Sequence, residues 1–177
     1  MANNIVSLDS LDFKFADFIS EVTGLSQDKV RIAYQPKGQT FSKFDEDVCY
    51  VKFYNENDDK QTFKQRENKY NSEDETTTIT QRTMRMLQLH LVFYGQNSGE
   101  YAALVNEILY TNKGKDFLYA NNLALIPEKT SFPFKSYEEN NGRWWKRDDV
   151  KLYFYNSISI EETVGTISDL DITILRN

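Results

Sequence analysis

The stretch that decides the fold is residues 76–94, TTTITQRTMRMLQLHLVFY. Its second half, Leu87–Tyr94, is apolar on both faces apart from Gln88 and His90, which is typical of a central strand covered on at least one side. Its first half, Thr76–Arg85, has the same β-forming character but almost no apolar face. We therefore expect a strand in the core sheet whose leading part runs out into solvent.

The segment before this strand predicts its partner. Residues Gln61–Tyr70 match the polar half in character, and the acidic, turn-rich segment 71–75 lies between the two. The pattern predicts a long β-hairpin whose base lies in the core sheet and whose arm, residues 61–85, projects into solvent. A two-stranded arm alone is marginally stable in water, so we expect it to be flexible or to pair with another chain. The candidate contacts with another subunit or partner on this arm are Phe63, Arg66, Tyr70, Ile79 and Arg82.

The remaining elements are predicted from hydrophobic periodicity and from the residues that cap helices or form turns. Residues 7–24 predict an amphipathic helix, capped by Ser7 and ended by Gly24, with Asp12 among the acids of its polar face. Further expected elements are strands Val30–Tyr34, Val48–Tyr54, Leu123–Ile126 and Arg143–Ile160, helices Ser98–Thr111 (capped by Ser98) and Lys113–Asn121, a loop from Pro127 to Gly142, a turn at Glu161–Gly165 and a closing strand Ile167–Leu175. This order predicts a single α+β domain over residues 1–177, with an antiparallel or mixed sheet, helices packed on one face and a long protruding β-hairpin.

Composition excludes several classes. The 177 residues carry a formal net charge of −6, which argues against a DNA-binding module with a basic face. No apolar run approaches the ~18 residues of a membrane helix, and the N-terminus lacks the pattern of a signal peptide, so we expect no membrane partner. The single cysteine, Cys49, cannot form an intrachain disulfide, which favours a reducing compartment.

Residues that carry chemistry are few. One histidine, His90, and one cysteine, Cys49, cannot together make a metal site, and the 7 glycines form no phosphate-binding loop. We interpret His90 as a hydrogen-bonded sheet residue and Cys49 as a small buried hydrophobe. We therefore expect no catalytic residue, no metal and no cofactor. The acidic clusters 45–47, 58–59 and 73–75 leave a hydrolase with paired carboxylates as one alternative.

The run Arg143-Trp144-Trp145-Lys146-Arg147 is the sharpest local feature. Adjacent residues of a strand point to opposite faces, so we expect one tryptophan in the core and the other against a partner or a basic stem. Trp144 and Trp145 are therefore further candidate contact residues. Stacking on a sugar or a base is the alternative.

Three stretches together resemble the phage neck (tail) terminator family. The first is residues 18–41, FISEVTGLSQDKVRIAYQPKGQTF, running on to Asp45-Glu46-Asp47 and Cys49-Tyr50. The second is Leu87–Gly95, LQLHLVFYG, followed by a helix, and the third is Asn141–Val150, NGRWWKRDDV, followed by the final strands. In order and spacing the resemblance covers about residues 8–175.

The resemblance implies a structural virion protein without catalytic activity. It implies a homo-oligomer, a hexameric ring in the neck or tail, assembled in the host cytoplasm and joining head to tail. Its partners would be a connector or adaptor protein of the neck, a tail or tail-tube protein, and genomic DNA that passes through the lumen without specific binding. The acidic chain agrees with this, because it repels a sliding polyanion. The alternative from another class is a carbohydrate- or receptor-binding virion module that uses exposed Tyr and Trp.

Overall fold

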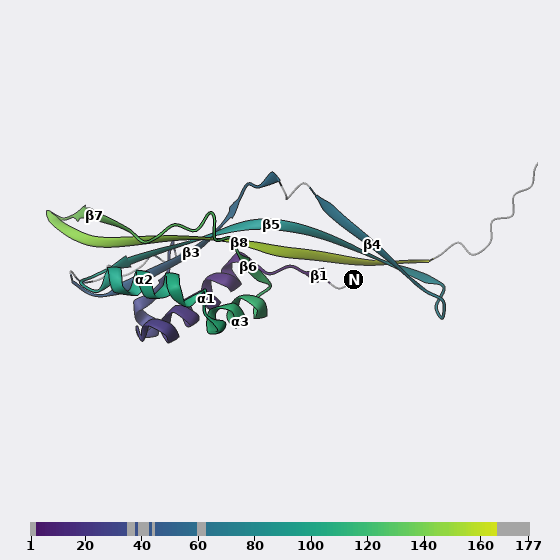
Figure 1. Cartoon of the computed structure of the whole chain (residues 1–177), viewed down its shortest axis with the longest axis horizontal. Coiled ribbons are helices and arrows are strands. Elements are labelled where there is room, and N and C mark those ends of the chain that lie inside the picture. Colours follow the sequence, from purple (N-terminus) through teal and green to yellow (C-terminus); the bar gives the residue numbers. More distant parts are fainter. Residues whose placement is uncertain (1–2, 35–37, 39–42, 44, 60–62, 166–177) are drawn as a thin grey trace, which may run out of the picture.

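Three helices cover one face of a long mixed β-sheet in the computed structural model of the chain (Figure 1). The structure describes residues 3–34, 38, 43, 45–59 and 63–165. The helices are α1 (Leu8–Thr23), α2 (Ser98–Ile108) and α3 (Asn112–Ala120), and a short 3-10 turn, η1 (Gln27–Lys29), follows α1. This arrangement confirms the predicted α+β class.

The sheet is organised around two long neighbouring strands. The central strand β5 (Thr76–Tyr94) pairs antiparallel with β8 (Arg143–Gly165) without a break, from Thr76 opposite Gly165 to Tyr94 opposite Arg147. On the other edge of β5 lie β3 (Val48–Glu56), beside its inner half, and β4 (Lys64–Asn71), beside its outer half. The short strand β2 (Val30–Ile32) joins β3 in parallel, which makes the sheet mixed. The outer edge of β8 carries β7 (Phe134–Asn140), β6 (Leu123–Leu125) and β1 (Asn3–Asn4).

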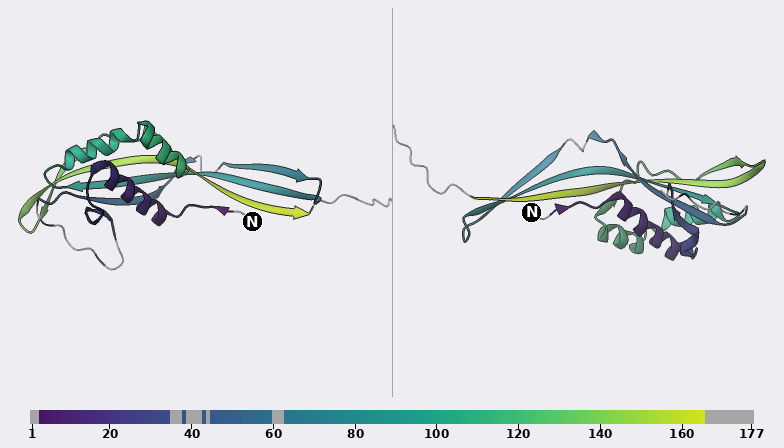
Figure 2. Two further views of the ribbon diagram at one scale, coloured as in Figure 1. Left: turned by 90° about the horizontal axis from the view of Figure 1, so that it is seen from below. Right: turned by 180° about the vertical axis from the view of Figure 1, so that it is seen from behind.

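The core lies between the sheet and the helices. Alternate residues of β5, from Leu87 to Phe93, turn towards the helices and are fully buried. Phe15 of α1 is the centre of this layer, with its ring 4.9 Å from the rings of both Phe53 and Phe117. Large apolar side chains therefore fix the helices to one face, and no helix of the described residues covers the other face of the sheet (Figures 1 and 2).

Helix α1 has the predicted caps, but its polar face was misjudged at one residue. The Ser7 hydroxyl accepts from the backbone N–H of Ser10, and Gly24 adopts the left-handed conformation that ends the helix. Asp12, expected on the solvent side, is fully buried. Its carboxylate accepts from the backbone N–H of Phe53 at 2.7 Å and from Lys52 Nζ at 2.8 Å. Burial raises the pKa of Asp12, although both hydrogen bonds lower it.

The arm differs from the expected two-stranded hairpin. Strands β4 and β5 do pair across the tip at residues 71–76, but β8 continues along the other side of β5 as far as Gly165. The predicted turn at Glu161–Gly165 is therefore wrong, because these residues lie in β8. A third strand completes the arm within the same chain, and the arm extends well past the helices (Figure 2).

Three smaller expectations also need correction or lie outside the described residues. The segment expected as a loop contains β7, which a tight turn at Asn141-Gly142, both with positive φ, joins to β8. Ser98 is not the cap of α2: Asn97 occupies that position, and the Ser98 hydroxyl donates to Asp148 at 2.5 Å. The expected closing strand Ile167–Leu175 lies outside the described residues.

Candidate functional site

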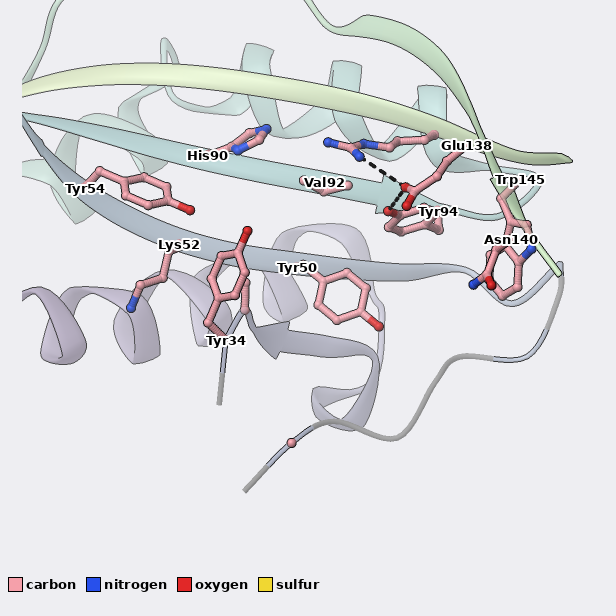
Figure 3. A pocket seen from close by; sticks show the side chains of 13 residues that line it. Tyr34, Tyr50, Lys52, Tyr54, His90, Val92, Tyr94, Glu138, Asn140 and Trp145 are labelled. Carbon is pink, nitrogen blue, oxygen red and sulfur yellow. Dashed lines mark hydrogen bonds and ion pairs between the residues drawn. The ribbon is translucent and has the colours of Figure 1, made fainter. Parts of the chain in front are cut away.

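A hollow of about 470 Å³ opens on the helix-free face of the sheet. Four strands line it with alternate residues that point away from the helices (Figure 3). Its largest lining side chains are aromatic: Tyr34 after β2, Tyr50 and Tyr54 of β3, Tyr94 of β5 and Trp145 of β8. Lys52, His90, Glu138 and Arg147 add charged or ionisable groups to the lining. We call this surface the aromatic hollow.

Aromatic contacts hold the walls of the hollow in place. The Tyr94 ring meets the Tyr50 ring edge-on at 5.9 Å and the Trp145 ring edge-on at 6.1 Å. The Tyr94 hydroxyl donates to Glu138 at 2.6 Å. Burial raises the pKa of Tyr94 well above its ordinary value, and this hydrogen bond adds to the effect, so the phenol stays protonated and polar.

A charged network lies beside the hollow on the same face. Arg147 donates to Asp149 through Nε at 2.6 Å and through Nη2 at 2.7 Å, and it also donates to Glu138 at 3.1 Å. Nε2 of His90 lies 3.1 Å from Asp149. Burial raises the pKa of Asp149, but the hydrogen bonds from His90 and Arg147 outweigh it and lower the pKa to about 2. These residues form a closed ionic cluster that ties β5, β7 and β8 together.

The arm brings some predicted contact residues to one face. In the strand register, Tyr70 stands opposite Thr77 and Thr77 opposite Val164, while Ile79 stands opposite Glu162. Paired residues share a face, so Tyr70 and Ile79 align with three apolar residues of β8. We call this set the arm stripe: Tyr70, Ile79, Ile158, Ile160 and Val164.

The other predicted arm residues are distributed differently. Arg66 stands opposite Gln81, which is opposite Ile160, so Arg66 borders the stripe. Arg82 lies on the opposite face, where it pairs with Glu67 at 3.8 Å. Phe63 precedes β4 and is exposed. Sequence reasoning missed the contribution of β8, although the alternation Ile158, Ile160 was a usable signal.

The family model described as "Phage neck terminator protein" matches residues 11–177. The chain belongs to the phage neck terminator family. Membership makes it a structural protein of the phage neck and tail. A search of curated proteins finds no match.

The three stretches that resemble the terminator family meet at the aromatic hollow. The first supplies Tyr34 after β2, the second supplies His90 and Tyr94, and the third supplies Trp145 and Arg147. Tyr34 and Trp145 are 111 positions apart in this terminator chain, yet both line this surface. The hollow was not predicted, because its lining comes from four strands that no local pattern connects.

The tryptophan pair only partly meets the expectation. Trp144 and Trp145 stand opposite Glu139 and Glu138 and therefore lie on opposite faces of β8, as predicted. Neither is in the core, however. Trp144 is 65% exposed, and Trp145 is half-buried against Tyr94 in the hollow. The reason is that β7 extends the sheet here beyond the helices.

The residues considered above for catalysis or metal binding have structural roles in this terminator chain. Cys49 is fully buried, and burial raises the pKa of its thiol. The acids of 45–47 hold loops: Asp47 accepts from the backbone N–H of Asn97 at 3.0 Å, and Glu46 pairs with Lys29. Within the described residues, no group of three or more His, Cys, Asp and Glu side chains is placed to hold a metal ion. In the same part of the chain, every helix is too short or too polar to span a membrane.

Proposed function

We propose that the chain is a subunit of a closed ring, most simply of six copies, between the connector and the tail. The family match over residues 11–177 carries this proposal. The elongated shape supports it, because the arm stripe at one end and the aromatic hollow at the other offer two different surfaces. A cyclic ring needs such a pair, since each subunit contacts its neighbours head to tail.

The proposed ring lets genomic DNA pass without binding it. A net charge of −6 on each subunit gives about −36 for six copies, which repels a polyanion sliding through the lumen. We expect acidic loops to face that lumen. The other proposed partners are a connector or adaptor protein on the head side and a tail or tail-tube protein on the far side, joined during assembly in the host cytoplasm.

The proposal also includes the absence of catalysis. Three ionisable groups of the helix-free face are engaged with one another, because Arg147 and His90 both contact the Asp149 carboxylate. A screen for hydrolysis of nucleic acid, peptidoglycan and polysaccharide tests this. Turnover that disappears in a folded His90→Ala or Asp149→Asn variant would favour the hydrolase alternative.

Light scattering of the purified chain and electron cryo-microscopy of particle necks test the ring. We expect a closed ring whose density fits the sheet and arm at the junction between head and tail. A chain that is monomeric both in isolation and in the particle would rule the ring out, as would density placed elsewhere in the virion. A lumen lined mainly by Lys and Arg would contradict the proposed passage of DNA.

The aromatic hollow favours one second candidate, a carbohydrate- or receptor-binding module. Tyr50, Tyr54 and Trp145 could stack on the apolar face of a sugar ring, with Glu138 and Asn140 as hydrogen-bonding groups. A glycan array with the wild type and Trp145→Ala tests this. Binding by the wild type that is lost in the folded variant would favour this candidate over a purely structural role.

A further inference from the structure

Strand β4 is an open edge of the sheet. Within the described residues it pairs only with β5, and all eight of its residues are exposed. It borders the arm on one side, as β8 does on the other (Figure 2). Its outer side therefore offers a row of backbone N–H and C=O groups with which another strand can pair, and its sequence, KQRENKYN, contains no proline that would prevent this.

The charges of this edge select what can pair with it. β4 carries three basic side chains, Lys64, Arg66 and Lys69, and one acidic side chain, Glu67. Lysine on an edge strand hinders the addition of a purely apolar strand, because its charge would be buried without a partner. A strand that brings acidic side chains opposite these bases meets no such obstacle.

A segment of this kind begins at the same end of the arm. Strand β8 reaches the tip at Gly165, which stands opposite Thr76, and Thr76 stands opposite Asn71, the last residue of β4. Residues 166–177, TISDLDITILRN, follow Gly165 and lie outside the described residues. The family match runs through to residue 177, so this segment is part of the terminator domain.

The segment has the pattern of a strand with one apolar side. Leu170, Ile172 and Ile174 alternate with Asp171 and Thr173, which is the period of two that a half-buried strand requires. A strand that returned from the tip would run antiparallel to β4, because β4 and β8 both run towards the tip.

The length of the segment matches the distance it must cover. Neighbouring strands lie about 4.8 Å apart, so a strand on the outer side of β4 lies about 14 Å from β8. At about 3.3 Å per residue, residues 166–169 span that distance. Residues 170–177 are then left to pair, and they equal β4 in length.

We propose that residues 170–177 form a fourth strand of the arm, antiparallel to β4 of the same chain, with Leu170 opposite Tyr70. In this register Asp171 stands opposite Lys69, and Leu170, Ile172 and Ile174 extend the arm stripe. A shift by one residue would place Leu170 opposite Lys69. A shift by two residues towards the body would place Asp171 opposite Glu67, so charge favours the proposed register.

The tether favours the chain's own arm over that of a second copy. A connection of four residues that reaches the edge holds the segment there at an effective concentration far above that of free chains. The fourth strand then closes the edge of β4 against strands of other molecules, and the arm contacts its surroundings through the widened arm stripe. This strand goes beyond the proposed ring and does not depend on it.

The outer edge of β8 is nearer but fits the segment less well. Strand β1 already pairs with Ser159 and Ile160, which leaves only residues 161–165. That stretch carries Glu161 and Glu162 and no basic residue, so it repels an acidic strand.

Two further contacts act against the fourth strand at its ends. The acids of the tip, residues 73–75, repel Asp169, so the preference for β4 rests on Asp171 with Lys69. Arg176 stands opposite Lys64 in the proposed register, so we expect the pairing to fray at that end.

Disulfide trapping tests the proposal, and the fully buried Cys49 leaves the native background unreactive. Asn68→Cys combined with Ile172→Cys places two thiols opposite each other in the proposed register. One control combines Asn68→Cys with Thr173→Cys, which points to the other face, and a second combines Glu162→Cys with Ile172→Cys, which reports on the edge of β8. Dilute protein is oxidised with diamide, and non-reducing electrophoresis with peptide mapping separates intrachain from interchain bonds. Circular dichroism and melting temperature confirm that each variant is folded.

We expect about fivefold more intrachain disulfide between residues 68 and 172 than in either control, at a yield that does not change on dilution. Equal yields, or the highest yield in the Glu162→Cys variant, would overturn the proposal. A bond that forms only between chains, in a mixture of the single variants Asn68→Cys and Ile172→Cys, would also overturn it and would indicate exchange of the strand between copies. Trapping of the intrachain bond in a chain that never forms rings would support the fourth strand and refute the ring.

A charge exchange tests the register. Asp171→Lys, added to the Asn68→Cys and Ile172→Cys variant, places two bases opposite each other, and a further Lys69→Asp restores an opposite pair. We expect the yield of the disulfide to fall about threefold with Asp171→Lys and to recover with both changes. An unchanged yield, or a loss without recovery, would overturn the register.

Hydrogen exchange of the wild type needs no introduced thiol. The fourth strand would protect the β4 amides that do not bond to β5, and we expect them to exchange about tenfold more slowly than in an unfolded chain. Exchange of these amides at the unfolded rate would overturn the proposal even if the cysteine variants failed to fold.

Discussion

Replacing Asp149 with Asn should make the free energy of unfolding depend less on pH. The pKa of this carboxyl falls from an ordinary 3.8 to about 2 in the folded chain. Because the pKa is lower in the folded chain, the ionised carboxylate stabilises the fold at pH values above its pKa in the unfolded chain. This contribution is lost as the pH falls through the pKa of the folded chain. The shift corresponds to about 2 kcal/mol, which is present at pH 7 and about half lost by pH 3.

The assay is equilibrium unfolding in urea of the wild type and Asp149→Asn at pH 7 and pH 3. We expect the variant to be about 2 kcal/mol less stable at pH 7 and about 1 kcal/mol less stable at pH 3. Asp9→Asn is the control, because Asp9 is exposed and lies 3.9 Å from Lys52; its effect should stay within about 0.5 kcal/mol at both values. An equal loss for Asp149→Asn at both pH values would refute the reasoning, because the cluster of Arg147 and His90 would then not act through ionisation.

Three further outcomes are expected. Asp12→Ala should lower the free energy of unfolding in urea by about 2–4 kcal/mol, because it leaves the Phe53 N–H unpaired in the core. Asp12→Asn should cost less, because one oxygen acceptor remains. Equal losses for the two variants would contradict this. Cys49 should react with a thiol reagent only as fast as the chain opens, and rapid labelling of the folded chain would show that its strand is not buried as described. Trp144→Ala should change stability by less than about 0.5 kcal/mol while Trp145→Ala costs about 1–2 kcal/mol, and calorimetric melting that ranks them in the reverse order would refute the assigned faces.

Local signals predicted the parts of the fold that depend on neighbouring residues. The caps of α1 at Ser7 and Gly24 and the apolar strand from Leu87 are local patterns, and the structure confirms them. Strand β7 was missed because its residues, FKSYEEN, do not alternate between apolar and polar. The Asn141-Gly142 dipeptide that follows is a strong hairpin signal and would have revealed it.

Long-range pairing decided the features that the sequence did not reveal. The third strand of the arm depends on β8 meeting β5, and no local pattern states that partnership. The burial of Asp12 depends on an unpaired backbone N–H at the edge of β3, which appears only once α1 is docked. The aromatic hollow has a partial signal in the alternation Tyr50, Lys52, Tyr54, but the other strands that line it are set by the register.

The continuous ladder between β5 and β8 also sets an order of events during folding. At its inner end it joins Tyr94 to Arg147, 53 positions apart, and at the arm tip it joins Thr76 to Gly165, 89 positions apart. Closing the shorter loop costs less chain entropy, so pairing should begin beside the helices and zip outward. The β4–β5 hairpin closes only the short tip at residues 71–76 and can form early, whereas the third strand of the arm joins last, so a nascent chain completes its arm stripe only after its body has formed. Half-folded chains would therefore be unable to recruit neighbours prematurely.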